Sequence, residues 1–327
     1  MAIIGIQTGK SNTEDAQEKG VYPLFDRSQV IKRSNKYLFD GEYVIVAGEG
    51  NFKPKYYNGK FDLHQRAYCL KSMNTEVINN KYLYYLVLKN YQIFSDYSVG
   101  STVPSLRLSS FSWIEKTIFP SVQEQQKIID IIEPLEILST KIEATKKMII
   151  SLLKMIANNK VEKTNELLIN HLTFEKGKNG PKEFESSGTP FLDVRTLNTR
   201  IPSKFVKDQP NTFKGDILLS LDATVGLVDW FIEGFNGYLY NLKSDHLTKV
   251  EILLNVLNDN NKKIIEMNAT GSTIKHASKA KKEMLYFKLH HEWKNITNTL
   301  FKLLLLVEEI GAKKTKLYQL CVNLLIR

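Results

Sequence analysis

The chain has 327 residues, 43% of them apolar and 24% charged, which is normal for a globular protein with room for two or three domains. Apolar stretches such as residues 303–307 fall far short of the roughly 20 residues required to cross a bilayer, so we expect no membrane-spanning segment. The opening Met-Ala-Ile-Ile predicts no secretion signal, and Cys69 and Cys321 are far apart, so we expect buried thiols in a cytoplasmic protein. The formal charge of +10 favours contact with a polyanion.

The first 120 residues predict a mixed α/β domain. Residues 39–48 place a glycine turn and an acid before a run of β-branched and aliphatic residues, which predicts a strand. A second strand is expected at residues 61–70, and residues 80–90 read as a helix. Residues 51–60 mix lysines with aromatic residues, a proline and a glycine, which is typical of a loop.

Residues 121–158 predict one long helix. Ser121 and Glu124 have the spacing of a capping box at its start, and Pro134 predicts a kink or a restart. Apolar residues recur every seven positions and form a narrow seam that requires a partner helix. The predicted seam consists of Ile128, Ile131, Leu135, Leu138, Ile142, Ile149, Leu152 and Ile156.

The second half of the chain repeats the first. The Gly-Lys pair at residues 9–10 recurs 168 residues later at 177–178, and the Gly-Ser-Thr at 100–102 recurs 171 residues later at 271–273. Because several such matches keep their order, we interpret the chain as a tandem duplication. The second domain is expected at residues 159–291.

Within that second domain, residues 213–222 and 237–242 predict strands, and residues 249–267 predict a helical segment. A second long helix is expected at residues 292–327, again with a seven-residue apolar repeat. Its predicted seam consists of Ile296, Leu303, Leu306, Ile310, Leu317, Leu320 and Leu324.

These elements predict an α+β fold. Two tandem mixed α/β domains are separated by a long antiparallel helical coiled coil. Antiparallel pairing of the helices would relate the two halves by an approximate two-fold axis, as in a homodimer fused into one polypeptide. The helix pair would then act as a spacer between the domains.

The motifs of common enzymes are missing from the sequence. There is no phosphate-binding GxxxxGK[ST] loop, no Gly-x-Ser-x-Gly elbow and no amino-methyltransferase tetrad. The histidines lack the spacing of a metal site. We therefore expect a chain that binds rather than catalyses, with no catalytic residue, no metal site and no cofactor of its own.

Polar and basic residues at corresponding places in the two halves are candidates for nucleic-acid contact. Lysines can neutralise phosphates, whereas Gln and Arg can read base edges. A solvated hairpin with surface lysines, and a plain turn at each Gly-Ser-Thr, are the alternatives. The candidates are Lys53, Lys55, Tyr56, Tyr57, Lys60, Gln65, Arg66, Ser101, Thr102, Arg107, Thr273, Lys275, His276, Lys279, Lys281 and Lys282.

A specific motif joins the first domain to the first long helix: Ile-Phe-Pro-Ser at residues 118–121 runs into Glu-Gln-Gln-Lys-Ile at 124–128. Together with the glycine matches at 9–20 and 100–104, it resembles the specificity (S) subunit of type I restriction-modification systems. The resemblance implies two target recognition domains, each reading one half of a bipartite site in double-stranded DNA. It also implies helices that fix the gap and dock two methyltransferase subunits.

The same resemblance places the chemistry on partners: AdoMet on the methyltransferase subunits, and ATP and Mg²⁺ on restriction (motor) subunits, with no membrane involved. The second helix departs from the family pattern, because residues 290–294 lack the Pro-Ser-x-x-Glu-Gln start. Two other classes stay open: a coiled-coil scaffold whose basic domains bind acidic partners, and an enzyme such as a nuclease or a methyltransferase fragment.

Overall fold

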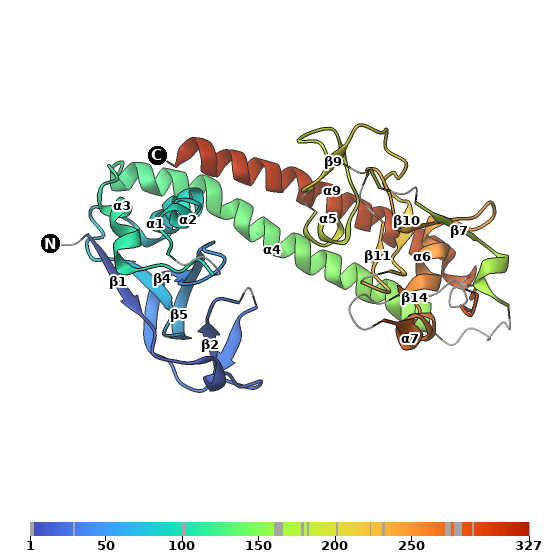
Figure 1. Ribbon diagram of the computed structural model, residues 1–327, viewed down its shortest axis with the longest axis horizontal. Coiled ribbons are helices and arrows are strands. Elements are labelled where there is room, and N and C mark those ends of the chain that lie inside the picture. The colour runs from blue at the N-terminus through green and yellow to red at the C-terminus, as the bar shows by residue number, and fades with distance from the viewer. Residues whose placement is uncertain are drawn as a thin grey trace. The chain divides into compact units, whose positions relative to one another are not determined.

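A computed structural model describes residues 3–28, 30–99, 103–159, 166–177, 180–181, 183–200, 202–222, 224–230, 233–271, 276–277, 283–289 and 291–326 (Figure 1). The chain divides into two compact units. Unit 1 comprises Met1–Ser139 and Lys314–Arg327, and unit 2 comprises Thr140–Lys313. The two long helices, α4 (Val122–Asn158) and α9 (Lys294–Leu325), therefore each contribute one part to unit 1 and one part to unit 2.

Unit 1 is built on a six-stranded sheet with the order β1-β6-β4-β5-β2-β3, in which only the β2–β5 pairing is parallel. The strands are β1 (Ile4–Thr8), β2 (Tyr22–Phe25), β3 (Lys32–Ser34), β4 (Phe39–Ala47), β5 (Lys55–Leu63) and β6 (Ala67–Ser72). The helical elements before α4 are α1 (Asn80–Asn90), α2 (Ile93–Asp96), α3 (Ser112–Glu115) and the 3-10 turns η1 (Thr13–Asp15) and η2 (Leu108–Phe111).

Alternation along β4 gives unit 1 two apolar clusters. Val44 and Val46 lie in the cluster that contains α1, whereas Ile45 lies in a second cluster with Phe25 and Phe61. α1 spans the predicted residues, because the Asn79 side chain caps its start by accepting a hydrogen bond from the Lys81 N–H. The sheet is thus covered on one side by α1, and its other side encloses a small aromatic core.

Two predictions for unit 1 are wrong. Residues 51–60 are not all loop, because β5 begins at Lys55 and its residues pair with β4 over their whole length to Phe61. Residues 61–70 are not one strand, because a turn at 64–66 separates the end of β5 from the start of β6. The lysine- and tyrosine-rich composition of 55–60 concealed a strand whose tyrosines pack inward.

Unit 2 contains a four-stranded antiparallel sheet with the order β11-β10-β12-β7. Read from β7, this order matches β1-β6-β4-β5 of unit 1, as a duplication predicts. The strands of unit 2 are β7 (Thr173–Lys176), β8 (Thr189–Pro190), β9 (Phe205–Val206), β10 (Ile217–Leu219), β11 (Val228–Asp229), β12 (Tyr240–Lys243), β13 (Ala269–Thr270) and β14 (His276–Ala277). Its shorter helical elements are η3 (Leu168–Asn170), α5 (Val194–Thr199), α6 (Lys249–Leu257), α7 (Asp259–Met267) and η4 (His291–Trp293).

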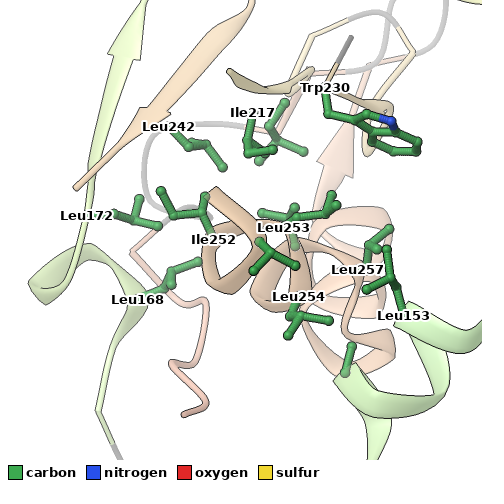
Figure 2. Packing of buried hydrophobic residues seen from close by; sticks show 14 of the residues in the cluster. Leu153, Leu168, Leu172, Ile217, Trp230, Leu242, Ile252, Leu253, Leu254 and Leu257 are labelled. Carbon is green, nitrogen blue, oxygen red and sulfur yellow. The ribbon is translucent and has the colours of Figure 1, made fainter. Parts of the chain in front are cut away.

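α6 is the centre of the unit 2 core. Figure 2 shows its Leu253 below Ile217 of the sheet and its Ile252 below Leu242, with Leu153 of α4 near Leu257. The predicted segment 249–267 is helical but divides at Asn258. The side-chain carbonyl of Asn258 caps α7, and the side-chain amide of the same residue donates to the Ala157 carbonyl at the end of α4 over 2.6 Å. Asn258 therefore lies at the end of α6, and its side chain caps the start of α7 and binds the end of α4.

In each unit, α4 and α9 pack against each other in antiparallel directions. In unit 1 the Tyr318 hydroxyl of α9 donates to Glu136 of α4 over 2.9 Å. In unit 2 the Lys146 amine of α4 contacts Glu308 of α9 at 2.7 Å. The expected capping box at Ser121 is present, and α4 continues through Pro134 as one helix, so the predicted restart is wrong.

The predicted seam is correct for the stripe of α4 that contains Ile128, Leu135, Ile142 and Ile149, because this stripe is covered. It is wrong for α9. Ile149 of α4 is buried, and Ile128, Leu135 and Ile142 are half-buried. The buried side of α9 instead carries Phe301, Leu304, Val307 and Val322. The predicted seam residues that are exposed are Ile131, Leu138 and Leu152 of α4 and Ile296, Leu303, Leu306, Ile310, Leu317, Leu320 and Leu324 of α9.

The physical reason for this error lies in the polar residues of the buried side. Glu308, Gly311 and Tyr318 interrupt the apolar pattern on that side of α9, whereas the exposed series at 296, 303, 310, 317 and 324 is uniformly aliphatic, with Lys313 as a polar exception in the companion position. Periodicity alone selects the more regular stripe. Each helix therefore has two apolar stripes, and only one of them is covered.

Glu136 offers a direct test of the helix packing in unit 1. Its carboxylate accepts hydrogen bonds from Tyr85 and Tyr318 and pairs with Lys81 at 2.7 Å. Glu136→Ala should lower the free energy of unfolding by about 3 kcal/mol, because three sheltered donors lose their acceptor. Chemical denaturation followed by circular dichroism measures this. Glu143→Ala, at an exposed position of α4, is the control, and equal effects of the two variants would contradict the packing role.

Candidate nucleic-acid interface

Three loops of unit 1, residues 26–28, 48–54 and 64–66, surround two neighbouring hollows. We call these three loops the loop edge. They follow β2, join β4 to β5, and join β5 to β6. The larger hollow has a volume of about 240 Å³. Its lining is mostly polar and charged: Thr13, Asp26, Arg27, Glu49, His64, Gln65 and Arg66.

The turn at residues 64–66 is held by backbone hydrogen bonds. The Gln65 N–H donates to the Ser11 carbonyl over 2.8 Å, and the Gly48 N–H donates to the Arg66 carbonyl over 2.8 Å. Gly48 is required by this approach, because a Cβ there would lie 2.3 Å from the Arg66 carbonyl oxygen. The turn therefore presents its side chains from a fixed backbone.

Charges at the loop edge are paired. The Glu49 side chain is only 14% exposed and contacts the guanidinium of Arg66 at 2.5 Å and that of Arg27 at 3.6 Å. Burial would raise the pKa of the Asp26 carboxyl, but hydrogen bonds from Lys32 and from the Ser28 N–H outweigh it and lower that pKa. Two ionised carboxylates thus lie beside two exposed guanidinium groups.

Five of the predicted contact residues in unit 1 are exposed. Lys53, Gln65 and Arg66 belong to the loop edge, whereas Lys60 is on β5 and Arg107 immediately precedes η2. Exposed lysines and arginines of this kind can neutralise phosphates. The structure therefore brings three of the five together.

The other predicted residues of β5 lie on a strand rather than in a loop, and each makes a contact within unit 1; their contact with DNA stays a prediction. The Lys55 amine donates to the Ser28 carbonyl over 2.6 Å, and burial lowers its pKa. Tyr57 packs against the aromatic core, and the Lys81 amine lies 4.3 Å from the centre of the Tyr56 ring. Of these three side chains, Tyr56 contacts α1, whereas Lys55 contacts the loop after β2 and Tyr57 contacts the aromatic core.

In unit 2, His276 is the one predicted contact residue that the structure describes. It is exposed, with its Nδ1 3.0 Å from the Asp222 carboxylate, which the Lys176 amine also approaches at 3.3 Å. The rest of the set lies outside the described residues and stays predicted: Ser101 and Thr102 of the first half, and Thr273, Lys275, Lys279, Lys281 and Lys282 of the second.

Gln125 has a role that the sequence did not reveal. It is fully buried, accepts from the Asn79 N–H and donates to the carbonyls of Val77 and Pro120. It therefore ties the start of α4 to the start of α1. This gives a physical reason for the glutamine in the Glu-Gln motif, which was the available signal.

Neither a metal site nor a membrane span is found among the residues that the structure describes. No group of three or more His, Cys, Asp or Glu side chains there could hold a metal ion. No helix in that part of the chain is both long and apolar enough to cross a bilayer.

Comparison with known proteins agrees with the nucleic-acid interpretation. The family model described as the type I restriction modification DNA specificity domain matches residues 3–151, which include the whole loop edge and Gln125. Residues 3–151 are thus similar to a DNA specificity domain of this family. The matched region ends within α4, so it includes the start of the long helix.

Two known proteins add to the comparison. The type I restriction enzyme EcoDI specificity subunit of Escherichia coli is 33% identical over 144 residues, which cover 44% of this chain and 31% of that protein. The match thus spans under a third of the relative's length. The crystal structure of the type I restriction-modification system S subunit from M. genitalium has a TM-score of 0.63 at 15% identity, covering 99% of this chain and 94% of that one. It shows that the fold is shared.

Lys53 tests whether the loop edge contacts DNA. Lys53→Glu should weaken duplex DNA binding and lower the slope of log K against log salt by about 0.9, because one phosphate contact is lost. Binding measured between about 50 and 200 mM salt gives this slope. Lys55 is unsuitable for the test because its amine is engaged by Ser28. Lys116→Glu, an exposed position outside the loop edge, is the control, and an unchanged slope for Lys53→Glu would exclude its contact.

Proposed function

We propose that the chain is the DNA sequence-recognition (specificity) subunit of a type I restriction-modification complex. The observation that carries the proposal is the loop edge of unit 1, which lies within the matched specificity domain and presents Lys53, Gln65 and Arg66 from a fixed sheet. Binding loops on a rigid scaffold are typical of recognition domains. The excess of positive charge favours a DNA duplex as the ligand.

Unit 2 reads the second half of an asymmetric bipartite site. The common order of four strands in the two units supports this, because duplicated domains keep a common framework. Their loops differ, however: unit 1 has the turn at 64–66 between β5 and β6, whereas residues 230–239 join β11 to β12 in unit 2. Different loops on a common framework read different half-sites.

The two long helices form an antiparallel coiled coil that relates the recognition domains by a pseudo-two-fold axis and sets the gap between half-sites. Support comes from contacts at matching positions. Glu136 and Glu308 are 172 residues apart, and so are Lys146 and Tyr318; Glu136 pairs with Tyr318, and Glu308 pairs with Lys146, each on the other helix. α4 has 37 residues and is about 55 Å long at 1.5 Å per residue, more than one turn of duplex DNA.

The uncovered stripes of α4 and α9 dock two methyltransferase subunits. Exposed aliphatic residues lie at matching positions of the two helices, for example Leu138 and Ile310, and Leu152 and Leu324. In unit 1 a groove of about 290 Å³ adds to this surface. It is lined by Pro120, Glu124, Lys127, Ile128, Ile131, Leu324 and Leu325. Apolar surface of this kind is typical of an interaction site, and two equal stripes fit two copies of one partner.

In this scheme the chain is not an enzyme. The methyltransferase subunits bind AdoMet and methylate an adenine that is flipped from the stack, while ATP and Mg²⁺ act on the restriction (motor) subunits. The residues of this chain select the DNA, hold its two half-sites at a fixed separation and position the partners beside the adenine.

The function is tested by expressing the chain with the proteins encoded beside it and mapping methylated adenines across the host genome. We expect one asymmetric motif with an unspecified gap between its two halves. Methylation without such a motif, or none at all, would contradict the proposal. Capture of acidic proteins by the chain, without retention on duplex DNA, would instead support a scaffold.

Partner docking is tested at the stripe of α9. Leu317→Glu together with Leu320→Glu should abolish co-purification with the methyltransferase subunit, because two charges enter an apolar contact. Circular dichroism should show unchanged helix content, since both side chains are about half exposed in the chain. Gln319→Glu, an exposed neighbour between them, is the control; complex formation that survives the double substitution would place docking elsewhere.

A further inference from the structure

The side chain of Arg66 is exposed yet fixed at both of its ends. Its backbone lies in the turn at residues 64–66, where its N–H donates to His64 Nδ1 over 3.1 Å and its carbonyl accepts from the Gly48 N–H. Its guanidinium contacts the Glu49 carboxylate at 2.5 Å. The Arg66 side chain is 66% exposed, whereas Glu49 is 14% exposed, so a sheltered acid orients a solvent-facing cation.

A guanidinium held in this way presents hydrogen-bond donors that match the hydrogen-bond acceptors of one DNA base. Arginine carries five N–H donors in a planar fork, and the contact with Glu49 through Nη1 leaves the other nitrogens available. In the major groove, guanine offers O6 and N7 as a pair of acceptors that such a fork matches. Fixing the side chain beforehand reduces the entropy lost on binding.

We propose that Arg66, positioned by Glu49, donates to O6 and N7 of a guanine in the half-site that unit 1 reads. The proposal rests on the proposed function and adds a base and a pair of residues to it. Arg66 is the reading residue, and Glu49 is a positioning residue.

The charges around Arg66 favour a base over a phosphate. Two carboxylates, Asp26 and Glu49, line the same hollow as Arg27 and Arg66, so the local charges nearly balance. A phosphate placed there would face both carboxylates, which repel it at short range. The edge of a guanine is neutral and rich in acceptors, so it gains the hydrogen bonds of Arg66 without that repulsion.

The neighbouring side chain leaves Arg66 as the main reader of the turn. The Gln65 amide donates to the Asn12 side chain over 2.6 Å, so one of its donors is occupied within the protein. Reading adenine requires both the donor and the acceptor of a glutamine amide to face the base. Among the described residues, Glu49 alone occupies a donor of the Arg66 guanidinium, and that contact orients the side chain.

The test uses the complex of the full chain with its methyltransferase subunits and a set of duplexes in which each base pair of the mapped motif is changed in turn. The wild-type complex should require a guanine in one half-site. Arg66→Ala should reduce discrimination at that single pair by about 5-fold to 150-fold, with an unchanged salt slope. Arg66→Lys should not restore it, because an amine cannot form the bidentate contact.

Glu49→Gln and Lys53→Ala separate positioning from general attraction. Glu49→Gln should relax discrimination at the same base pair and no other, because the arginine stays but its orientation is no longer fixed. Lys53→Ala should weaken binding to all duplexes alike. The inference is overturned if neither half-site contains a guanine, or if Arg66→Ala lowers binding to every duplex equally with a smaller salt slope. Absence of any sequence-specific methylation by the wild-type complex would instead overturn the proposed function.

Discussion

A sheltered carboxylate between the two long helices fixes how each unit is assembled. In unit 1 it is Glu136 of α4, which accepts from Tyr318 of α9, and in unit 2 it is Glu308 of α9, which contacts Lys146 of α4. Apolar stripes alone allow two helices to slide by a turn, since one leucine replaces another. A carboxylate removed from water is tolerated only where its donors are, so it specifies a single register. The register of the helices in turn sets where each sheet is held: the Lys89 amine at the last turn of α1 donates to the Ile326 carbonyl at the end of α9.

The sequence predicts the elements better than it predicts their faces. The limits of α1 and the capping box at Ser121 are local signals, and the structure contains both. The covered side of α9 is not a local property. It depends on Glu308 finding Lys146, which is 162 positions earlier in the chain, and no periodicity contains that information. The same limit applies to β5, whose lysines and tyrosines resemble a loop until the partner strand β4 is in place.

In the candidate site, too, some features can be predicted from the sequence and others cannot. Exposed cations such as Lys53 and Arg66 can be predicted from composition and turn residues. Within the described part of the chain, only nearby side chains compete with a ligand for these charges. Glu49 could not be found in this way, since a single acid next to glycines carries no signal in the sequence. Its role follows only from the close approach of Gly48 to the Arg66 carbonyl, which brings the two loops together. The geometry of the candidate site therefore depends on backbone packing between loops as much as on its exposed side chains.

The two stripes on each helix explain why so many aliphatic residues stay exposed. One stripe is used inside the unit, where Leu304 and Leu153 are completely buried. The other consists of residues at matching positions of α4 and α9, such as Ile131 and Leu303, which are 51% and 42% exposed. Leaving aliphatic side chains in water has a free-energy cost of about 25 cal/mol per Å², which a second binding partner removes. A helix that only held its own unit together would need one apolar side, so the second stripe indicates that each helix has a further surface to cover.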